Sequence, residues 1–224
     1  MKPRRLVVPD VHGCVKTLRR LLEETVRLER MDTVYLLGDL IDRGPDPKGV
    51  LDYVLLLRNK GYRPVALRGN HEQMLLDACH DRSDFRLWLM NGGTTTLESF
   101  GVEDACEIPL SYRHFLDNLP YYLILPDVVL VHAGINCAES EPFSDYTAML
   151  WSRDPAVDRQ KLGGRRLICG HTACRRDEAL TSLAGDRVTL DNGCVYVGRS
   201  GMGCLTALDL DAGTIVFQEN CDLP

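Results

Sequence analysis

The chain has 224 residues, of which 45% are hydrophobic, enough for one α/β domain with a sizeable core or at most two small domains. A net charge of −6 excludes the basic footprint of proteins that bind nucleic acid or anionic membranes, and the longest apolar stretch, 121–131, is too short to span a bilayer. Nine cysteines, odd in number and without a Cys-x-x-Cys pair, argue against disulfides, so we expect reduced thiols in a cytoplasmic protein.

The front half of the chain alternates predicted strands and helices. Apolar runs predict strands at 5–8, 34–37 and 64–67, and amphipathic patterns predict helices at 14–28 and 46–58. We expect no signal peptide, because the first predicted strand begins within a few residues of the start. This β-α-β-α-β order is typical of a parallel sheet with right-handed crossovers.

The second half changes character. Residues 71–118 are predicted to be helical, with Ser83 and Asp84 as candidate caps of a helix that Gly92-Gly93 would end. Short strands separated by turn residues then follow, at 122–125, 128–131, 166–169, 180–184, 188–190, 205–210 and 215–217. Because no linker or repeat is evident, we interpret residues 1–224 as a single α/β domain in which two sheets face each other.

Metal-binding residue types follow five of the predicted strands. The motifs are Asp10-Val11-His12-Gly13, Gly38-Asp39-Leu40-Ile41-Asp42-Arg43-Gly44, Gly69-Asn70-His71-Glu72, His132-Ala133-Gly134 and Gly170-His171-Thr172. Oxygen and nitrogen donors gathered at strand ends are what a site for two divalent cations requires. A single histidine in such a place is more often a packed or capping residue, but four of the six histidines occupy these positions, which favours a shared site.

The spacing within the motifs suggests what the side chains can do. Asp10 and His12 are alternate residues leaving a strand, so both can reach one ion, although a helix cap with an incidental histidine is an alternative. Asp39 or Asp42 can bridge two ions while the other carboxylate orients a catalytic histidine. His71 is a candidate general acid, because a histidine can protonate a leaving alkoxide near neutral pH.

Two arginines are candidates for binding a phosphoryl group. Arg43 follows the second motif's carboxylates directly and offers a planar guanidinium fork to phosphoryl oxygens. Arg153 lies in Trp151-Ser152-Arg153-Asp154 and is a second candidate, with an ordinary surface turn as the competing interpretation. The residues alone therefore predict a metal-assisted hydrolase.

Taken together, these motifs resemble the phosphoprotein phosphatase family of calcineurin-like metallophosphoesterases, especially its compact bacterial and phage-lambda-type Ser/Thr phosphatases. The resemblance runs from about residue 5 to about 217 and includes the stretches 88–93 and 190–196. It implies a β-sandwich of two mixed sheets flanked by helices. It also implies two divalent metal ions, with manganese expected first and iron or zinc as alternatives.

The resemblance further implies residue roles. The implied metal ligands are Asp10, His12, Asp39, Asn70, His132 and His171, and the implied catalytic residues are His71, Asp42, Arg43 and Arg153. Asp39 would bridge the metals, His71 would be the general acid paired to Asp42, and the two arginines would hold the phosphate. The implied reaction is direct attack on phosphorus by a metal-bound hydroxide, without a phosphoenzyme.

Two features depart from the family pattern. Pro9 stands where a glycine is usual, and because proline fixes φ and lacks an N–H, the loop that carries Asp10 is expected to be stiffer. The segment 197–203 looks longer than in the phage-type enzymes. It is expected either to border the substrate cleft or to form a simple glycine-rich hairpin.

The expected substrate is a phosphoprotein or a small phosphoester, with Ser/Thr or Tyr specificity open, and the expected state is a monomer. The main alternative is a dinucleoside polyphosphate or other nucleotide phosphohydrolase of the same superfamily. A non-catalytic scaffold is disfavoured because every implied ligand is present. A structural zinc module of Cys169, His171 and Cys174 is disfavoured because no second ligand pair accompanies it.

Overall fold

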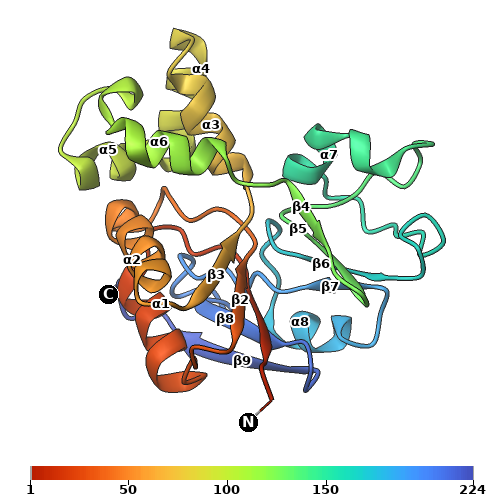
Figure 1. Cartoon of the computed structure of the whole chain (residues 1–224). Helices are drawn as coiled ribbons and strands as arrows, with labels where there is room; N and C mark the ends of the chain where they lie inside the picture. The colour runs from red at the N-terminus through yellow and green to blue at the C-terminus, as the bar shows by residue number, and fades with distance from the viewer. Residues whose placement is uncertain (1, 224) are drawn as a thin grey trace.

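The computed structural model describes residues 2–223 as two mixed sheets flanked by helices (Figure 1). The first sheet has the strand order β3-β2-β1-β8-β9 and the second β4-β5-β6-β7. The strands are β1 (Arg5–Val8), β2 (Thr33–Leu36), β3 (Arg63–Ala66), β4 (Tyr122–Ile124), β5 (Val128–Val131), β6 (Arg166–Cys169), β7 (Arg187–Thr189), β8 (Cys204–Asp209) and β9 (Thr214–Glu219). The predicted fold class is confirmed.

Helices cover the outer faces of the sheets and extend beyond them. They are α1 (Val15–Arg20), η1 (Leu21–Thr25), α2 (Pro47–Asn59), α3 (Asn70–Ala78), α4 (Arg82–Trp88), η2 (Leu89–Gly93), α5 (Thr94–Phe100), η3 (Ala105–Glu107), α6 (Leu110–Asp117), η4 (Pro142–Ser144), α7 (Tyr146–Trp151) and α8 (Arg176–Ser182). In Figure 1, α1 and α2 flank the first sheet, α3 to α6 gather at the top, and α7 and α8 lie beside the second sheet.

Each sheet has a parallel centre and an antiparallel edge. β1 pairs in parallel with β2, and β2 with β3, while β8 and β9 complete the first sheet in antiparallel fashion. In the second sheet β5, β6 and β7 are parallel and β4 is antiparallel. The carboxyl ends of parallel strands share one edge of a sheet, which is where ligands commonly bind in open α/β folds.

An apolar layer joins the two sheets. Val7 and Leu208 from the first sheet and Leu130, Ile168 and Val188 from the second belong to one buried cluster. A larger cluster packs the other face of the first sheet against the helices, and a third covers the other face of the second sheet. Burial of both faces explains why the parallel strands read as nearly continuous apolar runs in the sequence.

The front-half elements predicted from the sequence are present, with ends shifted by one residue in most cases. The helix predicted at 14–28 is shorter, because regular α-helix ends at Arg20 and a π-helical turn continues only to Thr25. The stretch 71–118 is helical without a strand, as expected. No helix within residues 2–223 has both the length and the apolar character needed to cross a membrane.

Two local predictions are wrong. Residues 180–184 do not form a strand, because Leu180 to Ser182 belong to α8, and the parallel partners β6 and β7 require a crossover that this helix supplies. The cap of α4 is Asp81, whose carboxylate accepts a hydrogen bond from the Ser83 backbone N–H. Gly92, at φ 106°, has a non-helical conformation and kinks the chain inside η2, two residues before α5 begins.

Candidate active site

The predicted ligands follow the carboxyl ends of parallel strands in both sheets. Asp10, Asp39 and Asn70 come after β1, β2 and β3, and His132 and His171 come after β5 and β6. Hydrogen bonds join the two sets across the sheets. The backbone N–H of His171 donates to Asp10 Oδ1 at 2.9 Å, and His132 Nε2 lies 2.9 Å from Asn70 Oδ1. The structure therefore brings residues 161 positions apart into one site.

Asp39 is shared by two groups of potential ligands. His12, Asp39 and His71 form one group and Asp39, His132 and His171 the other, with the ligand atoms of each group within 4.8 Å of one another. Asp39 Oδ2 lies 3.7 Å from His12 Nε2, and Asp39 Oδ1 lies 3.5 Å from His132 Nε2. One carboxylate oxygen thus faces each group, which is the arrangement that a carboxylate bridging two cations needs.

Backbone carbonyls fix which nitrogen of two histidines faces the site. His12 Nδ1 lies 3.0 Å from Ile41 O, and His132 Nδ1 lies 3.0 Å from Leu37 O. A carbonyl only accepts hydrogen bonds, so each Nδ1 carries a proton and each Nε2 keeps its lone pair for a ligand. The His132 lone pair converges with Asn70 Oδ1 and with His171 Nδ1, which lies 3.1 Å from it.

The charge state of the site fits divalent cations. Burial lowers the pKa of His12 and His132 well below the ordinary value and lowers the pKa of His171 to about 4, so all three imidazoles are neutral, the form that binds metals. Burial also raises the pKa of Asp10 and Asp39, because their negative charges are poorly compensated by this chain alone. Cations at these positions would supply that compensation.

Strained backbone is concentrated at the same place. Six non-glycine residues within 2–223 have positive φ, and five of them belong to the predicted site: His12, Asp39, Asp42, Arg43 and His171, with φ between 45° and 67°. Such conformations cost of order 1–3 kcal/mol each and persist where the surroundings enforce them. The strain is thus an independent sign of function.

Glu72 supports two of the site loops, a role that the sequence analysis did not assign. Its buried carboxylate accepts hydrogen bonds from the backbone N–H groups of Asp39 and Gly69, both at 2.8 Å, and of Leu40 at 2.7 Å. One side chain therefore joins the loop after β2 to the loop after β3 and holds Asp39 in its positive-φ conformation.

His71 and Asp42 form the pair that the resemblance implied. His71 Nδ1 lies 2.7 Å from Asp42 Oδ2, and both side chains are buried. Asp42 also accepts hydrogen bonds from Trp88 Nε1 at 2.9 Å and from Thr96 Oγ1 at 2.5 Å. Burial raises the pKa of Asp42 to about 7, although the hydrogen bonds from Thr96 and Trp88 act to lower it. Burial lowers the pKa of His71. The opposite ring nitrogen, His71 Nε2, has no hydrogen-bond partner within residues 2–223 and lies 3.9 Å from Asp39 Oδ2.

The glycines after Trp88 allow close packing on this pair. A Cβ on Gly93 would lie 2.5 Å from the Trp88 ring, and a Cβ on Gly92 would lie 2.8 Å from the side chain of Arg43. Gly92 also accepts a hydrogen bond from the Arg43 backbone N–H at 3.2 Å. The stretch 88–93 thus acts as a support for Asp42 and Arg43, which the sequence did not reveal.

Asp191 is a further buried carboxylate at the site. It follows β7, and its charge is the second cause, after burial, that raises the pKa of Asp10. Burial raises the pKa of Asp191 itself to about 6. The rule that polar residues after parallel strands belong to the site would have identified it from the sequence.

The arginines line an open cleft over these residues. Arg43 Nη1 lies 2.7 Å from His12 Nε2, and the charge of Arg153 is the second cause, after burial, that lowers the pKa of His171. The cleft holds roughly 270 Å³, and Arg43, Arg153 and Arg199 all contribute to its wall. The segment 197–203 therefore borders the cleft.

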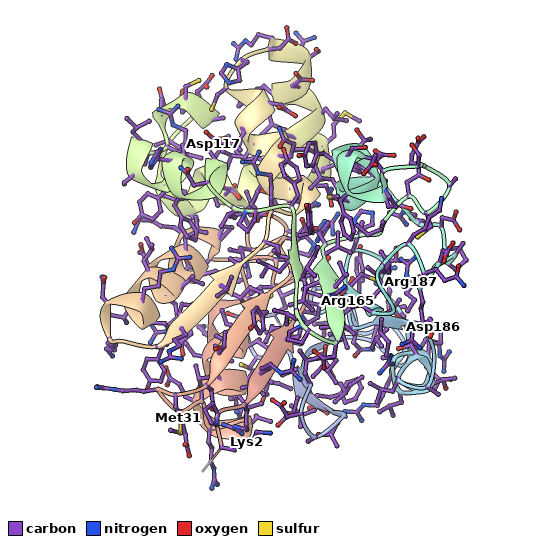
Figure 2. The ribbon with its side chains drawn as sticks, turned by 45° about the vertical axis from the view of Figure 1, so that its right-hand side comes forward. Lys2, Met31, Asp117, Arg165, Asp186 and Arg187 are labelled. Carbon is purple, nitrogen blue, oxygen red and sulfur yellow. The ribbon has the colours of Figure 1, made fainter. Side chains whose placement is uncertain are left out.

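The loop that carries Arg153 is tied to the second sheet by Arg187, which Figure 2 labels. The Arg187 guanidinium donates to the carbonyl of Ala133 at 3.1 Å and to that of Asp154. It also approaches Cys169 Sγ, at 3.2 Å. Neither of the potential metal groups within residues 2–223 contains a cysteine, which disfavours the zinc module.

Comparisons with known proteins agree with this geometry. A family model described as calcineurin-like phosphoesterase matches residues 3–175. The chain is 33% identical to Serine/threonine-protein phosphatase 1 of Salmonella typhimurium over 86% of this chain and 88% of that protein. It is 32% identical to a symmetrical bis(5'-nucleosyl)-tetraphosphatase of Pseudomonas syringae, over 57% of this chain but only 40% of that protein. A solved protein serine/threonine phosphatase from Saccharomyces cerevisiae superimposes with a TM-score of 0.67 at 14% identity, covering 99% of this chain and 81% of that one, and shows a shared fold.

Proposed function

Since the chain belongs to the calcineurin-like phosphoesterase family and is a metallophosphoesterase, we propose that it is a protein Ser/Thr phosphatase. We propose that it uses two divalent metal ions, with manganese as the expected metal. The main support for metal-dependent hydrolysis is the position of Asp39, which has one carboxylate oxygen facing each group of potential ligands. The similarity to a Ser/Thr phosphatase over 88% of that protein supports the substrate class.

Each group in the site has a task in phosphomonoester hydrolysis. Asp10, His12, Asp39, Asn70, His132 and His171 would hold the ions. When bound, two such ions lower the pKa of water and neutralise phosphoryl charge. Arg43 and Arg153 bind phosphoryl oxygens and orient the ester in the cleft.

The leaving alkoxide needs a proton, which His71 would hold at Nε2. Asp42 accepts a hydrogen bond from His71 Nδ1 at 2.7 Å and so fixes the ring with Nε2 beside Asp39, which lines the cleft. The Asp42 carboxylate is itself held by Trp88 and Thr96. A fixed ring orientation is what general acid catalysis requires.

A metal-titrated assay on chelator-stripped protein tests the proposal. It compares p-nitrophenyl phosphate, a phosphoserine peptide, a phosphotyrosine peptide and diadenosine tetraphosphate with added Mn²⁺, Fe²⁺ or Zn²⁺. Fast turnover of the phosphoserine peptide, lost in Asp39→Asn and His171→Ala, is the expected result. Turnover of both phosphopeptides would leave the metal chemistry standing and broaden the specificity to tyrosine.

A second candidate is hydrolysis of dinucleoside polyphosphates. Several relatives are named symmetrical bis(5'-nucleosyl)-tetraphosphatases, although the chain spans only 40% and 59% of the lengths of two of them. Turnover of diadenosine tetraphosphate without turnover of either peptide would replace the phosphatase proposal by this one.

A further inference from the structure

The segment 197–203 is a fixed wall of the cleft. Asn192 is buried, and its side-chain amide donates to the carbonyls of Gly201 at 2.8 Å and Cys174 at 2.9 Å. Its backbone carbonyl accepts from Gly203 N at 3.1 Å, and the Arg176 backbone N–H donates to Gly201 O at 3.0 Å. These hydrogen bonds connect the segment 197–203 to residues 174–176, which follow His171. The side chains of the segment are therefore held in one arrangement.

Arg199 is the charged residue that this wall presents. Its guanidinium carbon lies 4.3 Å from the centre of the Tyr196 ring, and its backbone N–H donates to Tyr196 O at 3.2 Å. Both residues line the cleft together with Arg43 and Arg153. Stacking on an aromatic ring pre-orients a guanidinium, so less side-chain freedom is lost when it binds an anion.

The cleft holds more positive charge than one phosphate requires. Arg43 and Arg153 already match a phosphomonoester dianion. Within residues 2–223, no ion pair at 4.0 Å or closer involves these two arginines or Arg199. Among residues 2–223, Asp39 is the one carboxylate that lines the cleft, and three arginines outnumber it. The chain has a net charge of −6, so this local excess of positive charge is distinctive and favours a polyanionic substrate.

We propose that Arg199 binds a second anionic group on a phosphopeptide substrate, a carboxylate or another phosphoryl group beside the reacting phosphate. This inference rests on the proposed phosphatase function. A peptide is favoured over a nucleotide because the chain spans 88% of a Ser/Thr phosphatase but only 40% of a symmetrical bis(5'-nucleosyl)-tetraphosphatase. Arg199 and Trp151 are also exposed at the cleft, where a peptide can reach them.

The test compares three phosphoserine peptides of one sequence, with neutral flanks, with flanking aspartates, and with a flanking second phosphoserine. For the wild-type protein we expect kcat/KM to be roughly fivefold higher for at least one anionic peptide, mainly through KM, as for an ion pair at the edge of a site. Which peptide gains identifies the source of the anion. The preference should weaken in high salt, because exposed charges are screened.

Variants assign the preference to Arg199. In Arg199→Ala the ratio of anionic to neutral peptide should fall to about one, and Arg199→Lys should restore part of it. The matched control is Arg58→Ala, which removes an exposed arginine stacked on Phe115 at 5.1 Å, outside the cleft, and should keep the wild-type ratio.

The outcomes separate the two proposals. Equal turnover of all three peptides by the wild-type protein, or an unchanged ratio in Arg199→Ala, would overturn the role of Arg199 and leave the phosphatase function intact. Failure to hydrolyse any peptide would overturn both. Hydrolysis of diadenosine tetraphosphate that depends on Arg199 would assign this arginine to a nucleotide phosphate instead.

Discussion

His71 is held by Asp42 on one side of its ring and presents the other nitrogen, Nε2, beside Asp39. We expect His71→Asn to bind the same amount of metal as wild type and to turn over roughly 10² to 10⁴ times more slowly, as loss of a general acid does. Metal content is measured by elemental analysis and turnover with a phosphoserine peptide.

The leaving group distinguishes a general acid from a metal ligand at His71. p-Nitrophenolate departs with little help from an acid, whereas a serine alkoxide needs a proton. The defect should therefore be smaller with p-nitrophenyl phosphate than with the peptide. Loss of one metal equivalent would instead make His71 a ligand, since His71 belongs to the group of potential ligands that contains His12 and Asp39.

Glu72 supports two loops of the site but does not line the cleft, so we expect its replacement to disturb the site indirectly. Glu72→Gln removes the charge from an acceptor of three backbone N–H groups and turns an amide NH₂ toward one or more of them. We expect a loss of roughly 1–3 kcal/mol in the free energy of unfolding, together with weaker metal binding, because buried donors lose their partner. Urea titration and metal titration measure the two effects. Glu98→Gln, at an exposed position, is the control, and equal behaviour of both variants would contradict this role.

The sequence identifies residues with chemically distinctive side chains better than it identifies their supports. Asp39, Asn70 and His171 could be predicted as candidate ligands because oxygen and nitrogen donors at strand ends form a pattern along the chain. Glu72 and Trp88 could not be assigned, because their roles depend on which backbone groups and side chains meet after folding. Glu72 and Trp88 both lie in stretches that the sequence analysis singles out, but the hydrogen bonds that define their roles join segments far apart in the chain.

At the scale of elements, the strand predicted at 180–184 shows where local pattern is insufficient. The run is apolar enough for a strand, yet Glu178 accepts a hydrogen bond from the Arg175 backbone N–H at 2.6 Å and starts a helix upstream of it. Thr181 then donates to Asp177 O at 2.8 Å. Because β6 and β7 are parallel, the connection has to cross over, a requirement known only once the pairing is known.

The start of α1 depends on a residue near the other end of the chain. Cys14 provides no side-chain cap, and Asp222 accepts hydrogen bonds from the backbone N–H groups of Lys16 at 3.0 Å and Thr17 at 2.8 Å. Figure 1 shows the C-terminus beside this helix. We expect Asp222→Ala to lower the free energy of unfolding by about 1 kcal/mol, as loss of a helix cap does.

Differential scanning calorimetry measures this loss, and Asp211→Ala is a useful comparison. Asp211 also pairs with a distant segment, through Arg5, but at an exposed ion pair that is not a helix cap. A smaller effect is expected there. If removal of Asp222 costs no more than removal of Asp211, the capping role is refuted.

At the scale of the whole molecule, two kinds of contact join the sheets. Arg5 of the first sheet pairs with Asp127 in the turn between β4 and β5 at 2.6 Å, but Asp127 is 50% exposed, so this pair contributes at most about 1 kcal/mol. The buried layer between the sheets contributes more, since truncating one of its leucines to alanine costs about 2–5 kcal/mol. Apolar packing therefore determines how the sheets are placed.

The proposed metal ligands follow strands of both sheets, so sheet packing and metal binding should be coupled. Leu208 lies on β8 in the layer between the sheets, while Leu51 lies on α2 in the cluster on the opposite face. We expect Leu208→Ala and Leu51→Ala to lose similar stability, about 2–5 kcal/mol, but only Leu208→Ala to weaken metal affinity as well. In the wild-type protein, each site filled by metal at 100 times its Kd should add about 2.7 kcal/mol to the free energy of unfolding, a gain that Asp39→Asn should reduce. Thermal unfolding without Mn²⁺ measures the stability of each variant, and the increase on adding Mn²⁺ measures how strongly the metal binds. Equal metal affinity in the two leucine variants would mean that the ligands of each sheet are positioned independently of the layer between them.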